Sequence, residues 1–449
     1  RLNWVSKLGY GVGHVLNDLC AAMWFTYVLI FYSLVLGFGA FDAGVVMLVG
    51  QLADAAATPV IGILSDRGPK CCGINLRKRK VWYITGSLLV VLTVPFLYSQ
   101  CLGCTNASPV IKLVYYNIFV VLFQFGWAAA QVAHLAFVPD LTPDENERTF
   151  LLSIRNTFTV LSNISVYFVA FGVLEITTNG KGEARLTPED LTKFQYIIFI
   201  ICGVGAITTV FFCITVKEDP QVPLLVTDDE QQIVSADVTI APRRTIGGLF
   251  SSLSLYQVAG VYMGTRIFCN VIQSLVPLYL HETLQLDAQS IAIIPFVMYV
   301  SSFVTSLLSG WLNGACGRKI TYILGAVVCV GASIWVWLDH GYLYNTYFIY
   351  IVAVLFGGAT SVLLVTALAV TADHIGDDTG NSAFLYGIMS FVDKLSCGIV
   401  IIIIQALQKN IGQKWFYRDS LAIVCAASAI MGAVSLLTMK GPNRGRFYR

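Results

Sequence analysis

The sequence predicts an all-α membrane protein with twelve transmembrane helices in two six-helix halves. Of its 449 residues, 56% are hydrophobic and 12% are charged, whereas a typical soluble domain is roughly 25% charged. A helix needs about 20 mostly apolar residues to cross the hydrocarbon core of a bilayer, where its backbone must be hydrogen-bonded internally. Apolar runs of this length occur twelve times along the chain.

Polar breaks separate these runs. The runs lie near residues 8–36, 43–65, 81–101, 110–138, 150–176, 195–216, 251–280, 289–312, 320–338, 344–371, 382–408 and 419–439. A transmembrane β-barrel would instead show segments of about ten residues that alternate apolar and polar. The long continuous runs, such as residues 399–407, exclude a barrel.

The longest polar break divides the chain into two parts. Residues 217–250 are rich in acidic residues and proline and have no helical apolar stripe, which is typical of a linker. We therefore expect an N-terminal half over 1–216, a linker over 217–250 and a C-terminal half over 251–449.

Lys and Arg residues are distributed unevenly between the two sides of the predicted bundle. Eighteen fall on the side of the termini and the linker, and seven fall in the opposite loops. Because basic residues favour the cytosolic side, we expect both termini and the linker to be cytosolic. The net charge of +2 carries no further message, and we expect no nucleic acid partner.

Similar loops follow the second and the eighth run. Their recurrence one half apart is what two parallel repeats produce. Such loops hold helix ends together on the cytosolic side, so we expect gating roles for Gly62, Asp66, Arg67, Gly317 and Arg318. The basic run at 76–80 is interpreted instead as a solvated loop placed by the positive-inside rule.

The opposite side carries a CLGC sequence and a glycosylation sequon. Cys101 and Cys104 can form a disulfide in an oxidising lumen, although four-residue disulfide loops are strained and a zinc site would need two more ligands. Asn106 begins an NAS sequon on the same loop, which makes it a possible glycosylation site and agrees with the predicted orientation.

Ionisable residues inside the runs are the main functional candidates. A charge at the bilayer centre costs on the order of 3 kcal/mol, so such residues normally face a cavity and serve function. Six of these residues are the main candidates: Asp18, Asp54, Arg155, Arg266, Asp393 and Lys394. Three cations and three carboxylates would also balance in a closed neutral core, so balance alone does not prove transport.

Helical spacing groups some of these candidates with polar neighbours. His14 and Asn17 share a polar face with Asp18, which we expect to line a cavity. Arg155 begins a polar stripe in the fifth run, and Gln131 lies on a potentially path-lining face of the fourth. Arg266 and Asp393 form a possible charge pair, functional or structural.

Several segments resemble the glycoside-pentoside-hexuronide cation symporters of the major facilitator superfamily, whose prototype is melibiose permease. The loops after the second and eighth runs resemble the superfamily's cytosolic signature loop. The other matching segments are KLGYGVG (7–13), LADAAATPVIG (52–62), VPDL (138–141), SIRNTF (153–158), and TADHIG followed by YGIMSFVDK.

The resemblance implies roles for individual residues. Asp18 and Arg155 match substrate-site positions, Asp54 matches part of the cation site, and Lys394 matches a central lysine of the eleventh helix. Two departures put sodium and sugar in doubt. Thr58 stands where a second cation-site carboxylate is expected, and Gln131 replaces a sugar-binding acid.

Further details resemble an animal branch of the superfamily that imports cysteine into lysosomes and melanosomes. They are GHVLNDLCAAMWFTY, SQCLGC, FQFGWA and MSFVDK. The resemblance implies cysteine as cargo and a lysosomal and melanosomal membrane location, whereas the residues alone indicate a small polar solute. Leu224 and Leu225 follow Asp219 and resemble a dileucine signal for the sorting machinery.

We expect a secondary transporter that works by alternating access. Protons are a possible coupling ion, through Asp54 or Asp18, because a sodium cage would need more oxygen ligands. A cation-coupled sugar or lysophospholipid carrier remains an alternative, as does a receptor or scaffold that moves no solute. We expect no enzyme activity, metal or cofactor, since the chain has no Ser-His-Asp set, metal-spaced His cluster or phosphate-binding loop. Membrane lipid is the expected surrounding partner.

Overall fold

The computed structural model describes residues 2–67, 70–71, 74–75, 79–104, 107–142, 145–176, 186–217, 253–375, 382–411 and 413–439. The N-terminal helices are α1 (Trp4–Val12), α2 (Val15–Ile30), η1 (Phe31–Val35), α3 (Ala40–Arg67), α4 (Arg79–Leu97), α5 (Pro109–Leu141), α6 (Glu145–Ile176), η2 (Pro188–Asp190) and α7 (Leu191–Thr215). The C-terminal helices are α10 (Leu253–Leu278), η4 (Tyr279–Thr283), α11 (Ala288–Cys316), α12 (Arg318–Leu338), η5 (Tyr344–Phe348), α13 (Ile349–Ile375), α14 (Ser382–Ile411) and α15 (Phe416–Thr438).

The predicted all-α membrane fold is confirmed. In the described part of the chain, eleven helical segments are long and apolar enough to cross a membrane. The twelfth predicted span is α10, whose 26 residues lie within the bundle but include the polar side chains of Arg266, Asn270 and Gln273. One short hairpin joins β1 (Lys70–Cys71) to β2 (Ile74–Asn75), antiparallel, in the loop after α3.

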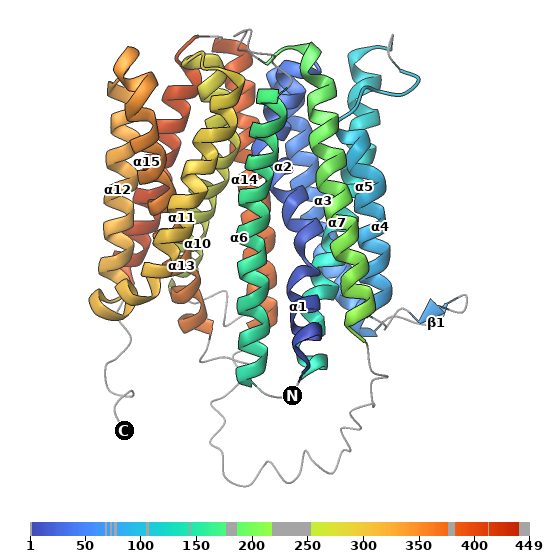
Figure 1. Ribbon diagram of the computed structural model, residues 1–449. Coiled ribbons are helices and arrows are strands. Elements are labelled where there is room, and N and C mark those ends of the chain that lie inside the picture. Colours follow the sequence, from blue (N-terminus) through green and yellow to red (C-terminus); the bar gives the residue numbers. More distant parts are fainter. Residues whose placement is uncertain are drawn as a thin grey trace.

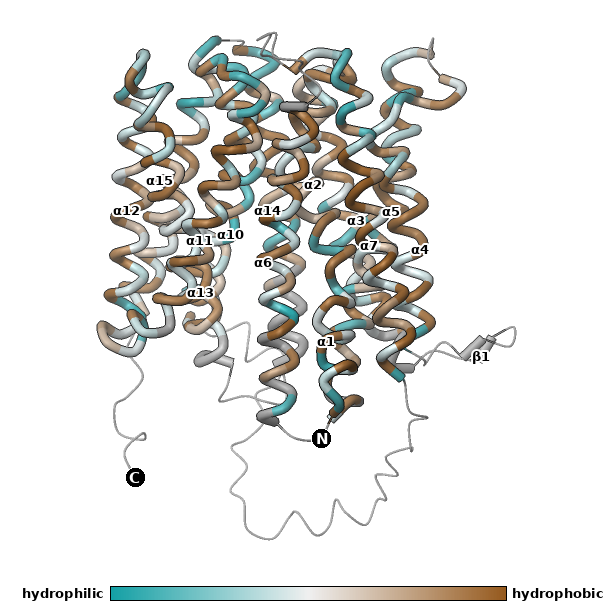
Figure 2. Tube along the Cα trace, viewed as in Figure 1, coloured by the Kyte–Doolittle hydropathy of each residue, from teal (hydrophilic) through white to brown (hydrophobic). Residues whose placement is uncertain are grey.

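The helices form two groups that stand side by side (Figure 1). In the described part of the chain, the most extensive contacts between the groups are those of α3 with α14, α6 with α11, and α2 with α10. The chain enters α1 and leaves α15 at the same end of the bundle, called here the terminal end, and the other end is the far end (Figure 1). Hydrophobic residues cover much of the outer helix surfaces, as a lipid environment requires (Figure 2).

Matching turns at the far end reveal the internal repeat. The first span of each half ends in one π-helical turn, η1 or η4. The amide of Leu36 donates to the carbonyl of Phe31 at 3.0 Å, and the amide of Leu284 donates to that of Tyr279 at 3.1 Å. The residue that follows has positive φ in both halves, +70° at Gly37 and +56° at Gln285. Gln285 keeps this conformation without the conformational freedom of glycine.

An Arg-Lys pair begins the third span of each half. The ammonium of Lys80 donates to the carbonyl of Val216, which ends α7, at 2.9 Å. Lys319 donates likewise to the carbonyl of Met439, which ends α15, at 2.6 Å. The last carbonyls of a helix lack intrahelical partners and carry partial negative charge, so a lysine stabilises them.

The arginines of the two pairs also correspond. Arg79 donates to the carbonyl of Ala136 on α5, and Arg318 donates to that of Ala369 on α13. The interpretation of residues 76–80 as a solvated loop is therefore wrong for its last two residues, because these bonds fix their side chains. Residues 76–78 lie outside the described residues.

The predicted gating residues lie at the terminal end. Gly317 has φ +78° and joins α11 to α12, a conformation that favours glycine. Nothing lies within 4 Å of a Cβ built on Gly62. Asp66 and Arg67 belong to the last turn of α3, and their side chains are outside the description. The bond of Arg318 stays within its own half, and the gating roles remain predictions.

Of the remaining loop predictions, the structure shows one, and the others fall on residues that it does not describe. Cys101 and Cys104 form a disulfide at the far end. Asn106, Leu224 and Leu225 lie outside the described residues, as does nearly all of the predicted linker.

A buried ion pair ties α1 to α6 at the terminal end. The ammonium of Lys7 lies 2.7 Å from Oε1 of Glu147, and Oε2 accepts a 2.8 Å hydrogen bond from Thr142. The bond from Lys7 has the largest effect and the bond from Thr142 the next, and together they lower the pKa of the Glu147 carboxyl to about 2. The carboxylate therefore stays ionised at neutral and mildly acidic pH, and the tie is lost only as pH falls from the ordinary glutamate range toward 2.

Gly86 sets the distance between α4 and α5. A Cβ built on it would lie 2.6 Å from both the amide nitrogen of Ala130 and the carbonyl oxygen of Gly126. Both are backbone atoms of a packed helix, so neither yields without moving α5. In contrast, a Cβ built on Gly331 in α12 meets nothing within 4 Å.

We predict that Gly86→Ala destabilises the protein and that Gly331→Ala does not. Alanine gains about 1 kcal/mol over glycine in a helix, but overpacking at Gly86 costs about 1–3 kcal/mol. Thermal unfolding of the two purified variants in the same detergent tests this comparison. Equal melting temperatures would show that α4 and α5 tolerate a wider separation.

Candidate substrate site

The first span breaks where its polar residues begin. Helix α1 ends at Val12 and α2 starts at Val15, so Gly13 and His14 connect two helices. Gly13 packs against α5 and α7 with no room for a Cβ, and its carbonyl accepts a 2.6 Å hydrogen bond from Tyr83. The break puts Asp18 in the first turn of α2, where the helix dipole favours a carboxylate.

Arg155, His14 and Asp18 form a chain of polar contacts between α6 and α2. Arg155 Nη2 lies 3.0 Å from Nε2 of His14, and arginine can only donate, so that ring nitrogen accepts. The proton of the neutral imidazole is then on Nδ1, which lies 2.9 Å from Oδ1 of Asp18 without the alignment of a hydrogen bond. Thr159 donates to the other carboxylate oxygen at 2.8 Å. Sequence reasoning placed His14, Asp18 and Arg155 on polar faces, and the structure brings them together with Thr159.

Two predicted substrate contacts have different surroundings. Asn17 donates to the carbonyl of Trp127 at 2.9 Å, and the indole of Trp127 donates back to the carbonyl of Asn17 at 3.2 Å. Asn17 is therefore a tie between α2 and α5, and one of its two amide N–H donors is already used. Gln131 lies one turn after Trp127 on α5 and is half-buried.

An ion pair joins the two halves at the middle of the bundle. Lys394 of α14 lies 2.6 Å from Oδ2 of Asp54 of α3. Thr58 accepts from the same ammonium at 3.3 Å and donates to the Asp54 carbonyl at 2.9 Å. Thr58 therefore extends the Asp54 site with a neutral oxygen, in the place where the family resemblance led us to expect a second acid. The ammonium also lies 5.9 Å from the ring centroid of Trp127, within cation–π range.

A second ion pair lies within the C-terminal half. Arg266 Nε on α10 is 2.8 Å from Oδ2 of Asp393 on α14. The other oxygen of Asp393 lies 3.4 Å from the thiol of Cys397, which in turn is 3.1 Å from the amide nitrogen of Asn270. Asp393 is almost fully buried, whereas 31% of the Arg266 side chain is exposed. The two adjacent residues 393 and 394 thus pair with different helices.

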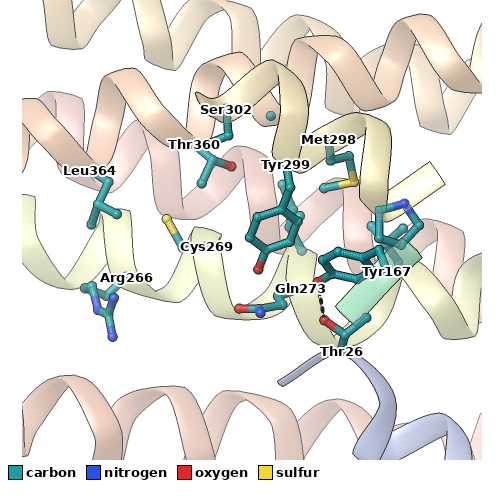
Figure 3. Close-up of a pocket in the computed structure, with 14 residues that line it drawn as sticks. Thr26, Tyr167, Arg266, Cys269, Gln273, Met298, Tyr299, Ser302, Thr360 and Leu364 are labelled. Carbon is teal, nitrogen blue, oxygen red and sulfur yellow. Dashed lines mark hydrogen bonds between the residues drawn. The ribbon is translucent and has the colours of Figure 1, made fainter. Parts of the chain in front are cut away.

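A cavity of about 190 Å³ lies between the two halves. Arg266, Cys269, Gln273 and Tyr299 line it from the C-terminal half, together with Met298, Ser302 and Thr360. The N-terminal half contributes Thr26 and Tyr167, which are on the opposite side of the cavity from Arg266 (Figure 3). Of the predicted substrate residues, none lines this cavity, although Arg266 had been predicted as a charge-pair residue.

Aromatic contacts between the halves border the cavity. The rings of Tyr167 on α6 and Tyr299 on α11 have centroids 4.9 Å apart. The hydroxyl of Tyr167 is 2.6 Å from that of Thr26, a hydrogen bond visible in Figure 3. Ser274 on α10 donates to the carbonyl of Phe25 on α2 at 3.1 Å. These residues stand closer to the far end than Arg266 does, so they separate the charged centre from that end.

Helices α3 and α14 continue this closure toward the far end. A Cβ built on Gly44 would lie 3.0 Å from Gln405, and one built on Gly398 would lie 2.8 Å from Leu48. Such spacing requires small residues where the two halves meet. In the described part of the chain, the contacts between halves therefore extend from the Asp54–Lys394 pair to the far end of this helix pair.

Sequence reasoning missed the cavity because its lining is mostly neutral. Tyr299 and Thr26 have no charge and lie in apolar runs, so nothing distinguishes them from packing residues. A signal existed for Tyr167, which lies four residues after the polar Asn163 in the fifth run, about one helical turn away. Gln273 also follows Arg266 by seven residues, two helical turns.

Comparison with known families agrees with this architecture. The family profile described as "MFS/sugar transport protein" matches residues 9–419, nearly the whole chain. The chain belongs to the major facilitator superfamily. Its relatives and its fold are those of transporters and not of enzymes.

An animal protein and a bacterial symporter are each similar in sequence to most of this chain. Human "Major facilitator superfamily domain-containing protein 12" is 38% identical over 415 residues, which cover 90% of this chain and 85% of that protein. An "Uncharacterized symporter" of Synechocystis is 21% identical over 469 residues, with the same 90% and 85% coverage. The resemblance to this superfamily and to melibiose permease-like symporters is thus confirmed.

A solved structure shows the same fold. The nucleoside transporter NupG superposes with a TM-score of 0.67 over 98% of this chain and 100% of its own, at 13% identity. At this identity the likeness concerns the fold alone.

The central ion pair gives a stability prediction. Breaking a buried pair by removing one partner typically costs about 3–5 kcal/mol, because the other charge stays buried without compensation. We expect Asp54→Asn and Lys394→Met each to lower the melting temperature, and the double variant to recover most of the loss. Thermal unfolding of the three purified variants tests this expectation. A double variant as unstable as the sum of the single variants would mean that the pair contributes no coupling.

Proposed function

We propose that this protein is a secondary transporter that moves a small zwitterionic solute, cysteine, from the cytosol into the lumen of lysosomes and melanosomes by alternating access. The observation that carries the proposal is a small cavity shared by two halves at the level of buried charges of both signs. Intramembrane charges of this kind normally mark a solute or ion path. Parallel six-helix halves that rock around a central site are the usual basis of alternating access in this superfamily.

The size of the cavity favours a small cargo. A volume of about 190 Å³ lies below the range of about 300–1,000 Å³ that is typical of pockets for drug-sized ligands. A lysophospholipid exceeds this space, and the neutral Thr58 and Gln131 stand where a sugar symporter of the resembled group has acids. An amino acid as small as cysteine fits both observations.

The charges suit a zwitterion. An ammonium group needs a carboxylate and a carboxyl group needs a cation. The centre of the bundle contains both kinds of group, with carboxylates on Asp18 and Asp54 and cations on Arg155, Lys394 and the cavity-lining Arg266. Closure at the far end supports a form that is open toward the terminal end. The positive-inside count assigns that end to the cytosol, so this form would receive cytosolic cargo.

Uptake of labelled cysteine into organelles that contain the protein tests the proposal. We expect uptake above organelles without the protein, and at least about a tenfold loss in Asp54→Asn and Lys394→Ala, because each leaves an unpaired buried charge beside the path. Lys414→Gln removes an exposed charge far from the cavity and serves as the matched control. Uptake no greater than in empty organelles would favour the sugar, lipid or receptor alternatives.

Protons are the coupling ion that we propose, because Asp54 has a single hydroxyl neighbour in Thr58 rather than the oxygen cage that sodium requires. Dissipating the pH gradient across the organelle membrane should then change the initial rate of cysteine uptake. Sodium at constant pH should leave that rate unchanged. A rate that is the same with and without the gradient contradicts proton coupling and leaves cysteine transport itself intact.

A further inference from the structure

Arg266 has an unusual combination of depth and exposure. It lies near the middle of α10, and 31% of its side chain is nevertheless accessible. Its Nε donates to Asp393. Among the residues that the structure describes, no hydrogen-bond acceptor is assigned to its two terminal NH₂ groups. A guanidinium has five donors in a planar fork, so most of its donor capacity remains available beside the cavity.

We propose that Arg266 binds the carboxylate group of the transported solute and that Asp393 is the positioning residue that holds it. This inference rests on the proposed transport function and assigns the anionic end of the cargo to α10 rather than to Arg155 or Lys394. The terminal edge of a guanidinium matches a carboxylate with two parallel N–H···O bonds. A lysine at this position would present a point charge without that geometry.

Asp393 is suited to positioning because each of its carboxylate oxygens already has a partner within the protein. Oδ2 accepts from Arg266 Nε, and Oδ1 is in contact with the Cys397 thiol. It is almost fully buried and does not line the cavity. Holding the guanidinium through Nε leaves the opposite edge available, which is the edge a carboxylate engages in a paired geometry.

Arg155 and Lys394 are less available for this role. The ammonium of Lys394 already contacts Asp54, Thr58 and the Trp127 ring. Arg155 contacts His14 through Nη2, and although its Nε has no hydrogen-bond partner in the described part of the chain, it does not line the cavity. Arg266 is therefore the cation with accessible donors at the cavity itself.

The rest of the lining indicates what the other end of the solute meets. The polar groups that line the cavity with Arg266 from the same half include the amide of Gln273, the hydroxyl of Tyr299 and the thiol of Cys269, all of them neutral groups. Across the cavity, Thr26 and Tyr167 belong to the other half. A solute anchored at Arg266 would thus touch both halves. The proposed cargo class is a small carboxylate with a polar substituent, and a cation without a carboxylate should bind more weakly.

Competition binding on the purified full-length protein tests the proposal. Labelled cysteine is displaced either by cysteine or by cysteamine, which lacks only the carboxylate. For the unmodified protein we expect cysteamine to compete at least about tenfold more weakly. In the double variant Arg266→Gln with Asp393→Asn, which removes both charges together, cysteine should weaken to the level of cysteamine. Arg266→Lys keeps the charge but not the planar fork, so it should retain only part of the preference for cysteine over cysteamine. The control Lys414→Gln should leave both affinities unchanged.

The result that overturns the proposal is a double variant that folds, as judged by its melting temperature, and keeps the full preference for cysteine over cysteamine. Cysteine transport would then stand with its carboxylate bound elsewhere. If the unmodified protein does not bind cysteine, the cargo assignment fails separately. The site is then tested by thermal shift with lactate and serine against lactamide and serinamide. Stabilisation by the carboxylates alone, lost in the double variant, supports the site; no such preference overturns it.

Discussion

The ion pair between Asp54 and Lys394 is the constraint on which the arrangement of the two halves depends. It is the charged contact that the described residues make between α3 and α14 at mid-membrane, and the small-residue packing of these helices continues from it to the far end. A charge at this depth is tolerated only when it is paired or hydrated. If the halves separate here, both charges need new partners, so a polar solute or water must replace the contact. Whether α3 and α14 stay packed together therefore depends on whether a solute or water is present to take over these two charges.

The internal repeat explains how each half remains rigid while that contact changes. The matching Arg-Lys pairs tie the third span of each half to the fourth and the sixth. The contacts between halves are made mainly by three helix pairs, and the most extensive of these is α3 with α14. Strong internal ties and a limited shared surface are what a rigid-body motion of two units requires. The cavity lies on this shared surface, so solute occupancy and the relative position of the halves are linked.

The fold was predictable from the sequence because a bilayer restricts a chain to long apolar helices, and run length, number and positive charge distribution are all visible in the residues. The charged positions at the site were predictable for the same reason, since an Asp or Lys inside an apolar run is conspicuous. Their partners were not. Nothing in the sequence says that Lys394 contacts Asp54 whereas its neighbour Asp393 turns to Arg266, because this depends on the rotation of α14 between two helices.

The repeat was only partly read from the sequence. Both halves contain Arg-Lys, then Tyr four residues after the Arg and Gly seven residues after it, at 79–86 and 318–325. Aligning the halves would have shown that Arg79 and Lys80 correspond to Arg318 and Lys319. Judged alone, 76–80 was indistinguishable from a loop placed by charge. A neutral cavity lining such as Tyr299 gives no comparable signal, since tyrosine in an apolar run is as common in packing as in binding.

The lysine caps also bear on biosynthesis. Lys80 finds its carbonyl acceptor 136 residues further along the chain, and Lys319 finds its acceptor 120 residues further. Neither bond can form until the sixth helix of its half has left the ribosome and entered the membrane. Each half therefore matures as one unit at the end of its own synthesis, and a chain interrupted before Met439 leaves the second half without its final tie.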